Sequence, residues 1–303
     1  MLNRIPLALA LCALITACSG PQVPEQTTED VEAPVPATGP VTFQAPDGVE
    51  IAATVHSLGQ VTVVLVHGWM CDQTYWEAQV PALAEHFGVV TVDVAGHGLS
   101  GTDRQAWTIS SLGEDVAAVI TNLQLENIVV VGHSMGGRVG LEVARLKPGT
   151  VVGVIGVDTL QDADHEPNPD ETEAFLGGLD QDFVATCDPF VRSMFGEQAD
   201  QALIDQVATD MCNGPGEVGA ALLRDYVEYD LAAALQGAGV PIRCVNADLW
   251  PTNVEANRQH ADFDAVILPG YGHFLMQEAP DELNLALIET VTTMTTEGRP
   301  TPN

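Results

Sequence analysis

Most of the chain alternates between short runs of consecutive hydrophobic residues and longer stretches with hydrophobic residues at helical spacing. Most of the short runs are rich in β-branched residues, which is typical of strands buried on both faces. Such strands are predicted at residues 62–67, 89–94, 127–131, 151–157, 242–246 and 264–268. Helical spacing predicts helices at residues 75–87, 112–123, 135–146, 218–235, 253–261 and 281–294. Two earlier strands, residues 41–45 and 50–56, flank Asp47-Gly48 and predict a hairpin.

This alternation predicts an α/β fold with a mostly parallel central sheet and helices on both faces, over residues 41–303. It breaks at about residues 161–217, which are acidic and contain four prolines. We expect this stretch to form a helical cap inserted after the sixth strand, with helices at residues 183–195 and 199–211. Its larger apolar side chains either line an acyl pocket or form the core of the cap: Phe175, Phe183, Phe190, Met194, Phe195 and Met211.

Residues 1–17 have the features of a secretory signal peptide. Arg4 supplies the positive charge, and the apolar run at residues 5–15 is shorter than a membrane-spanning helix needs. The run ends in Ile15-Thr16-Ala17-Cys18, which resembles the bacterial lipobox. That resemblance implies that Cys18 is lipidated and becomes the first residue of the mature protein. The alternative is an ordinary signal peptide with small residues before its cleavage site.

Residues 18–40 continue as a linker rich in proline and acidic residues, a composition that stays disordered. These segments together predict a protein of the bacterial cell envelope, anchored to a membrane by lipid and facing the periplasm or the exterior. An oxidising periplasm favours a disulfide, and we pair Cys187 with Cys212 because both lie in the same segment. The alternative is free, buried thiols. No Cys-x-x-Cys pair or His/Cys cluster in the sequence predicts a metal site.

Acidic residues outnumber basic ones by 42 to 10, which gives a formal net charge of −32. Such a surface repels phosphates, so the charge argues against a nucleic-acid partner. The acidity itself has two interpretations. One is adaptation to high salt, where repulsion between carboxylates is screened, and the other is a plain acidic exported protein.

The strongest chemical signal is the sequence IVVVGHSMGG at residues 128–137. Gly-x-Ser-x-Gly between a buried strand and a helix is typical of a nucleophile elbow, a tight turn that pushes the serine hydroxyl out of the sheet. Glycines at positions 132, 136 and 137 lack the Cβ atoms that would clash in such a turn. The helix that follows points its N–H groups at the site. Ser134 is therefore the predicted nucleophile.

A serine hydroxyl needs a base to become reactive. Of the eight histidines, His273 lies in the glycine-rich sequence PGYGHF after the last predicted strand, where the loop can bring the imidazole onto Ser134. His67 and His97 lie in glycine-containing loops after other strands, where a loop-stabilising hydrogen bond is the usual role. His273 is the predicted base.

The base in turn needs a carboxylate that holds its tautomer. In this architecture the acid lies between the serine and the histidine along the chain. Asp248 follows the strand at residues 242–246 and is the predicted acid. Asp158, at the end of the strand at residues 151–157, is the alternative.

Acyl transfer also needs two N–H donors for the oxyanion of the tetrahedral intermediate. The backbone N–H of Met135, which follows the nucleophile, is the first predicted donor. The second is the backbone N–H of Trp69, in the loop after the strand at residues 62–67, where Gly68 lets the backbone turn inward. The Trp69 side chain is equally consistent with plain packing.

Four motifs occur in order: VVLVHGW, VVTVDVAGHGLSG, IVVVGHSMGG and LPGYGHFLMQEAPDELN. Together they resemble α/β-hydrolases of the esterase and haloperoxidase-like group over about residues 41–303. In that family the loop containing Asp93 is structural, and enzymes of the dehalogenase or epoxide-hydrolase type have aspartate in place of Ser134. The acid region, residues 245–251, reads VNADLWP and not the more usual Gly-x-x-Asp, so the acid stays open between Asp248 and Asp158.

The resemblance implies a serine hydrolase that cleaves a small-molecule carboxylic ester through an acyl-enzyme, with no metal or organic cofactor. C–C bond hydrolysis and perhydrolysis use the same triad and are alternatives. A non-catalytic binding lipoprotein that kept the fold is a third. The complete set of Ser134, Asp248 and His273 argues against that last reading.

Overall fold

The computed structural model describes residues 38–297. The predicted signal peptide, Cys18 and nearly all of the predicted linker lie outside the described residues. Within them, eight strands form one sheet that begins at Gly39, slightly earlier than the domain boundary expected from sequence. The strands are β1 Gly39–Gln44, β2 Glu50–Ser57, β3 Thr62–Val66, β4 Gly88–Val92, β5 Ile128–His133, β6 Val151–Val157, β7 Ile242–Ala247 and β8 Phe263–Leu268.

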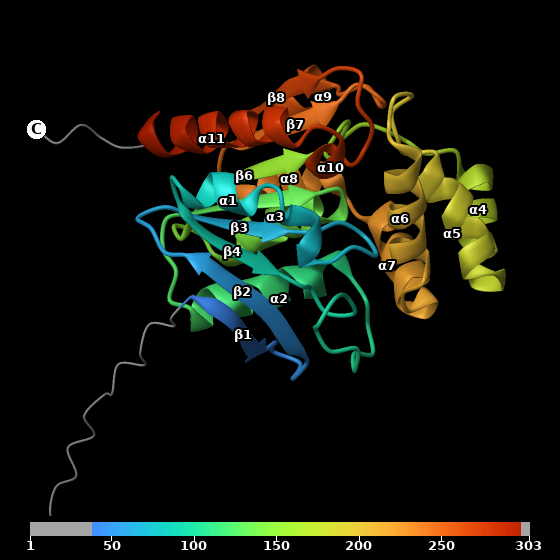
Figure 1. The fold of residues 1–303 in the computed structure, drawn as a ribbon, viewed down its shortest axis with the longest axis horizontal. Helices are drawn as coiled ribbons and strands as arrows, with labels where there is room; N and C mark the ends of the chain where they lie inside the picture. Colours follow the sequence, from blue (N-terminus) through green and yellow to red (C-terminus); the bar gives the residue numbers. More distant parts are fainter. Residues whose placement is uncertain (1–37, 298–303) are drawn as a thin grey trace, which may run out of the picture. The chain divides into compact units, whose positions relative to one another are not determined.

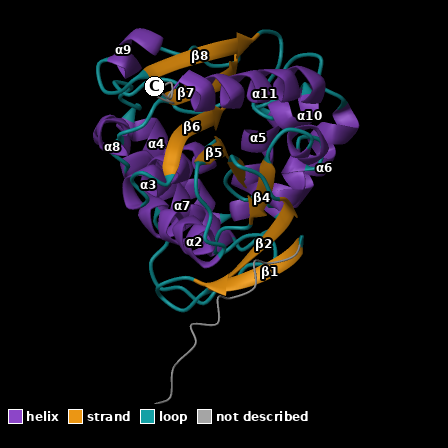
Figure 2. Ribbon diagram, turned by 90° about the vertical axis from the view of Figure 1, so that its left-hand side faces the viewer, coloured by secondary structure: helices purple, strands orange, loops and turns teal. Residues whose placement is uncertain are grey.

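The sheet has the strand order β1-β2-β4-β3-β5-β6-β7-β8 and runs from β1 at the bottom of Figure 2 to β8 at the top. Strand β2 pairs antiparallel with both β1 and β4, and the other five strand pairs are parallel. Strands β3, β4 and β5 are wholly buried, as their continuous apolar runs predict. The predicted α/β-hydrolase fold is confirmed. Because β5 and β6 are parallel neighbours, the residues that follow them meet at one edge of the sheet.

Helices cover both faces of the sheet. Helix α3 packs on β5, β6 and α2, and α11 packs on β6 and β7 from the other side (Figure 2). None of the helices in residues 38–297 is long and apolar enough to cross a membrane. Outside the cap, the helical elements are η1 Gln73–Trp76, α1 Val80–Ala84, α2 Ile109–Asn122, α3 Met135–Leu146, α8 Leu231–Ala238, α9 Val254–Arg258, α10 Leu275–Glu278 and α11 Pro280–Glu297.

Two predicted helices are each broken into two elements. Residues 75–87 contain the end of the short 3₁₀ helix η1 and then α1, which restarts with Pro81 in its first turn. Residues 218–235 divide between α7 and α8 because Asp230 caps a new helix and its carboxylate accepts a hydrogen bond from the N–H of Ala233. Hydrophobic spacing continues across both breaks, so the spacing alone did not reveal them.

The cap follows β6, as predicted, and lies at the right of Figure 1. It also includes a helix, α4, that the sequence pattern did not identify. The predicted disulfide is confirmed: Cys187 of α5 is bonded to Cys212 of α6, with 5.6 Å between their Cα atoms. The cap helices are α4 Pro169–Gln181, α5 Phe183–Arg192, α6 Gln201–Cys212 and α7 Gly216–Glu228.

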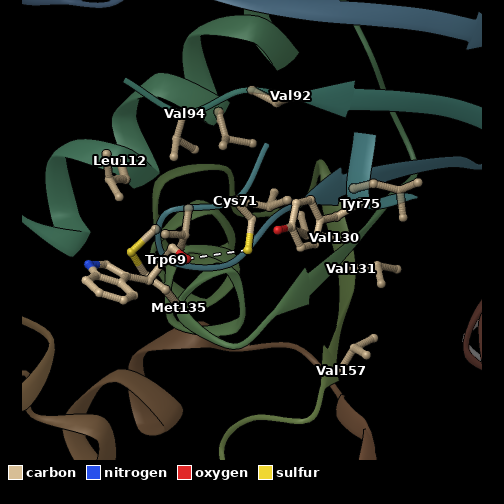
Figure 3. Close-up of a cluster of buried hydrophobic side chains, with 14 of the residues drawn as sticks. Trp69, Cys71, Tyr75, Val92, Val94, Leu112, Val130, Val131, Met135 and Val157 are labelled. Atoms are coloured by element: carbon tan, nitrogen blue, oxygen red, sulfur yellow. Dashed lines mark hydrogen bonds between the residues drawn. The ribbon is translucent and has the colours of Figure 1, made fainter. Parts of the chain in front are cut away.

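The hydrophobic core continues from the sheet to the loops that carry the predicted chemistry. Figure 3 shows part of it, with valines of β4, β5 and β6 around Cys71 and Tyr75. Trp69 and Met135 belong to the same buried cluster. The loops at the carboxyl ends of β3 and β5 are therefore supported by packed side chains.

Candidate active site

Ser134 lies between β5 and α3 in a strained backbone conformation, with φ 52° and ψ −117°. Such positive φ values are rare outside glycine and persist only where the surrounding structure imposes them. The turn is so tight that a Cβ atom at position 132 would collide with the carbonyl of Gly136. These features agree with the predicted nucleophile elbow.

His273 lies in the loop between β8 and α10 and contacts Asp158 at the end of β6. Its Nδ1 is 2.5 Å from Asp158 Oδ2, and both side chains are buried. The other carboxylate oxygen accepts a hydrogen bond of 2.8 Å from the N–H of Ala247. Because a carboxylate only accepts, His273 donates from Nδ1 and keeps Nε2 as the proton acceptor. This is the tautomer that a general base requires.

The prediction that Asp248 is the partner of His273 is wrong. Asp248 is exposed, and its carboxylate accepts a hydrogen bond of 2.7 Å from the N–H of Gly270. The physical reason is the strand order: Asp158 follows β6, the immediate neighbour of the strand that carries Ser134, whereas Asp248 follows β7, one strand further away. Asp248 is hydrogen-bonded to the loop that leads to His273 but does not contact the imidazole.

Ser134 and His273 line the same cavity, which has a volume of about 530 Å³. Within residues 38–297 no hydrogen bond joins the two side chains. Catalytic hydrogen bonds of this kind are often long in ligand-free enzymes and shorten when substrate binds.

Three further contacts hold the backbone around His273, and the sequence analysis predicted none of them. Its N–H donates to the carbonyl of Met194 in the cap at 2.7 Å. Its carbonyl lies 3.0 Å from His133 Nε2, which donates to it. The Glu278 carboxylate accepts from the amides on both sides, Gly272 at 3.0 Å and Phe274 at 3.2 Å. The imidazole is therefore fixed through its backbone as well as through Asp158.

Of the two residues predicted to supply oxyanion donors, Trp69 lies in the loop after β3, and Met135 lies at the start of α3, after β5. Neither the N–H of Trp69 nor that of Met135 has an acceptor among the described residues, and both residues line the cavity with Ser134. Gly68 brings the first loop close to the elbow, since a Cβ atom there would lie 3.3 Å from the Cβ of Ser134. The Trp69 indole donates to the carbonyl of Gly219 at 2.8 Å, so this side chain also joins the site to cap helix α7.

A family model described as "Alpha/beta hydrolase family" matches residues 63–286, the range that contains Ser134, Asp158 and His273. The chain belongs to this alpha/beta hydrolase family. It is thus a hydrolase enzyme with esterase-like relatives.

Two relatives with different names, a receptor and an esterase, each match about three quarters of this chain. The karrikin insensitive 2 receptor CA of Petunia hybrida is 25% identical over 251 residues, 77% of this chain and 93% of the receptor. The pimeloyl-[acyl-carrier protein] methyl ester esterase of Pectobacterium carotovorum subsp. carotovorum is 29% identical over 240 residues, 74% of this chain and 91% of the esterase. Among solved structures, the bromoperoxidase from Bacillus anthracis matches with a TM-score of 0.74 and 20% identity, covering 83% and 100% of the two chains. That likeness shows the fold.

Other polar side chains of this alpha/beta hydrolase are structural, as predicted. The buried Asp93 accepts hydrogen bonds from Gln73 and from the N–H of Leu99. Burial, followed by the neighbouring His67 imidazole, lowers the pKa of His97 to about 3, and burial also lowers the pKa of His67. Both imidazoles are neutral near pH 7 and serve as hydrogen-bonding groups in their loops.

His133 is also held neutral in the hydrolase. Burial, and next the charge of His273, places the pKa of His133 well below its usual range. Its Nδ1 is buried without a hydrogen-bond partner among the described residues. The ring centroids of His133 and His273 lie 4.6 Å apart. Because His133 is neutral, it adds no charge repulsion when His273 takes up a proton.

The cap and the loop after β7 form part of the cavity wall of the hydrolase. Three of the six apolar cap residues line it, namely Phe190, Met194 and Met211. Trp250 lies at the cavity, partly exposed, with its ring edge-on to His273 at a centroid distance of 5.1 Å. Within residues 38–297 no group of three or more His, Cys, Asp or Glu side chains is arranged to hold a metal ion.

Proposed function

We propose that the protein hydrolyses small-molecule carboxylic esters through an acyl-enzyme on Ser134. His273 is the general base, Asp158 orients it, and the N–H groups of Trp69 and Met135 bind the oxyanion. The observation that carries this proposal is the buried contact between His273 and Asp158, on the cavity that Ser134 also lines.

The chemistry follows from the positions of these groups. His273 Nε2 takes the proton of Ser134 as the hydroxyl oxygen attacks the ester carbonyl, and the oxyanion forms where the two N–H groups point. The imidazolium, opposite the Asp158 carboxylate, then gives its proton to the leaving alcohol. Water enters, loses a proton to His273 and attacks the acyl-enzyme, which releases the acid and restores Ser134.

Esters are favoured over the alternatives by the relatives. The 29% identical relative is named as a methyl ester esterase. C–C bond hydrolysis and perhydrolysis use the same groups. One relative is named as a receptor, so a binding function is the third alternative. The two unpartnered N–H groups and the oriented His273 favour catalysis, because binding alone requires neither.

Lipid anchoring at Cys18 in a bacterial cell envelope is part of the same proposal. The lipobox-like sequence supports it, and the disulfide between Cys187 and Cys212 suits an oxidising compartment outside the cytoplasm. Cys18→Ser should move the protein from the membrane fraction to the soluble fraction. Unchanged membrane fractionation would contradict the anchor.

The catalytic proposal is tested with a fluorophosphonate, which reacts with activated serines. The wild-type protein should be labelled at Ser134 and should hydrolyse p-nitrophenyl acetate or butyrate. Ser134→Ala should lose both the label and the hydrolysis while keeping its thermal unfolding transition. Folded wild-type protein that neither reacts nor hydrolyses these esters would favour the binding function.

A further inference from the structure

Arg138 lies on α3 four residues after Ser134 and lines the same cavity. Residues four apart on a helix lie on the same face, about one turn from each other. Arg138 therefore lines the cavity about one helical turn from the start of α3, where Ser134 lies. None of the proposed catalytic steps uses it.

This arginine differs from the others in its charge environment. Residues 38–297 contain seven arginines, and Arg138 is the one among them without a carboxylate partner. In a chain with 42 acidic residues, partners are abundant, so the lack of one at the cavity is specific to this position. The six that form ion pairs are Arg104, Arg145, Arg192, Arg224, Arg243 and Arg258.

The Arg138 side chain is nevertheless fixed in place. Its guanidinium carbon lies 3.6 Å from the centre of the Tyr226 ring and 5.6 Å from that of Tyr229. Nη1 donates to the carbonyl of Tyr226, and Nε is buried without an acceptor among the described residues. Nη2 is not buried in this way and makes no hydrogen bond to the described residues, so it is free to donate to a ligand. A stacked guanidinium with unused donors is preorganised for a planar anion such as a carboxylate.

The remaining cavity wall indicates what accompanies that anion. Two carboxylates also line the cavity, but both already accept hydrogen bonds from other groups of the protein. Asp158 accepts a hydrogen bond from His273. Asp162 accepts hydrogen bonds from the N–H of Asp164 and from the side chain of Asn253. Most of the other wall is apolar and includes Leu160, Phe190, Met211, Leu223 and Leu231.

We propose that Arg138 binds a free carboxylate of the substrate, so that the preferred esters are monoesters of dicarboxylic acids with a short apolar chain between the ester and the acid. This inference rests on ester hydrolysis at Ser134. The overall charge of −32 repels such anions, so a local cation is what lets them bind. The carboxylate at Arg138 and the ester carbonyl at Ser134 then fix the two ends of the chain.

The test compares kcat/KM of the full chain for an anionic ester and a neutral ester of equal length, monomethyl adipate and methyl hexanoate. The wild type should prefer the anionic ester about tenfold or more, the range expected for a hydrogen-bonded charge. Arg138→Met should reduce this preference at least about tenfold, and Arg138→Lys should keep part of it. Arg145→Met is the control, because Arg145 lies on the same helix, outside the cavity, and pairs with Glu142.

The outcomes separate the two proposals. A wild type that hydrolyses both esters without preference, or an Arg138→Met protein that keeps the preference, overturns the carboxylate inference while hydrolysis stands. A wild type that hydrolyses neither ester and takes no fluorophosphonate label overturns ester hydrolysis itself. If Arg138→Met does not fold, competitive inhibition of the wild type decides: adipate should inhibit at a concentration at least about tenfold lower than hexanamide, and equal inhibition overturns the inference.

Discussion

His133 Nε2 lies 3.0 Å from the backbone carbonyl oxygen of His273 and donates a hydrogen bond to it. His133 belongs to the elbow sequence itself, one residue before Ser134. The segment that carries Ser134 therefore also holds the loop that carries His273. A displacement of either segment would therefore displace the other as well.

Replacing His133 should lower catalysis by displacing His273. His133→Leu removes the donor, and we expect kcat to fall about tenfold, since a buried hydrogen bond contributes about 1 kcal/mol and the unpaired carbonyl adds to the loss. His133→Gln, which can still donate an N–H, should recover part of the activity. Steady-state hydrolysis of p-nitrophenyl butyrate at saturating substrate provides the measurement. Equal activity of His133→Leu and the wild type would show that the contact does not position the base.

Glu278 should couple the cap to the loop that carries His273. Its Oε2 accepts from the N–H of Gly196 in the cap at 3.1 Å as well as from Gly272 beside His273. Glu278→Gln replaces one carboxylate oxygen with a donor, so we expect kcat to fall about tenfold.

Glu282→Gln is the matched control for this change. Glu282 accepts from the Tyr271 hydroxyl at 3.2 Å in an exposed position, away from the base. The kcat of Glu282→Gln should stay near that of the wild type. If the two variants lose the same activity, the coupling role of Glu278 is refuted.

Buried neutral histidines should make the fold sensitive to acid. Burial and His67 lower the pKa of His97 to about 3, whereas an unfolded histidine titrates near 6.5. The unfolded chain therefore binds a proton that the folded chain does not, so stability is fully present above pH 6.5 and declines as the pH falls towards 3. Between pH 7 and pH 5 this one group should remove about 2 kcal/mol from the free energy of unfolding.

Urea unfolding of the wild type and His97→Asn at both pH values measures this contribution. The carboxylates titrate in both proteins, so their contribution cancels in the comparison. The variant should lose about 2 kcal/mol less than the wild type over the same interval. An identical loss in the two proteins would rule out the neutral state of His97 as a source of acid sensitivity.

The disulfide should stabilise the cap. It joins residues 25 positions apart, and the chain-entropy argument gives about 3 kcal/mol for a loop of this length. Cys187→Ser with Cys212→Ser should lower the melting temperature and raise KM, because Phe190 and Met211 of the bridged helices line the cavity. Reductant should reproduce these effects in the wild type and have no further effect on the double variant. A double variant with wild-type KM would show that the bridge does not shape the cavity.

Much of this arrangement was predictable from sequence because its signals are local. β-branched runs identified the strands, and glycine spacing identified Ser134 and the loop of His273. The acid was not predictable in this way. Asp158 and Asp248 both follow strands, and the sequence does not say which carboxylate turns inward. The structure decides through the strand order and through the positive φ of Asp158, 43°.

The remaining features depend on contacts between distant residues. Glu278 binds Gly196, 82 residues earlier, and no local pattern links them. The lack of a carboxylate partner at Arg138 could be recognised only from the structure, which shows the ion pairs of the other described arginines. Helix breaks such as the one at Asp230 were missed because hydrophobic spacing continued across them.

The central claim is that Ser134, His273 and Asp158 act as one catalytic unit. Its most direct test measures kcat/KM for a p-nitrophenyl ester in Asp158→Asn and Asp248→Asn side by side, with thermal unfolding as the check on folding. We expect Asp158→Asn to lose about 10⁴-fold in kcat/KM, because asparagine favours the wrong tautomer of His273. Asp248→Asn should stay close to the wild type. A large loss in Asp248→Asn together with an active Asp158→Asn would show that Asp158 is not the carboxylate that orients His273.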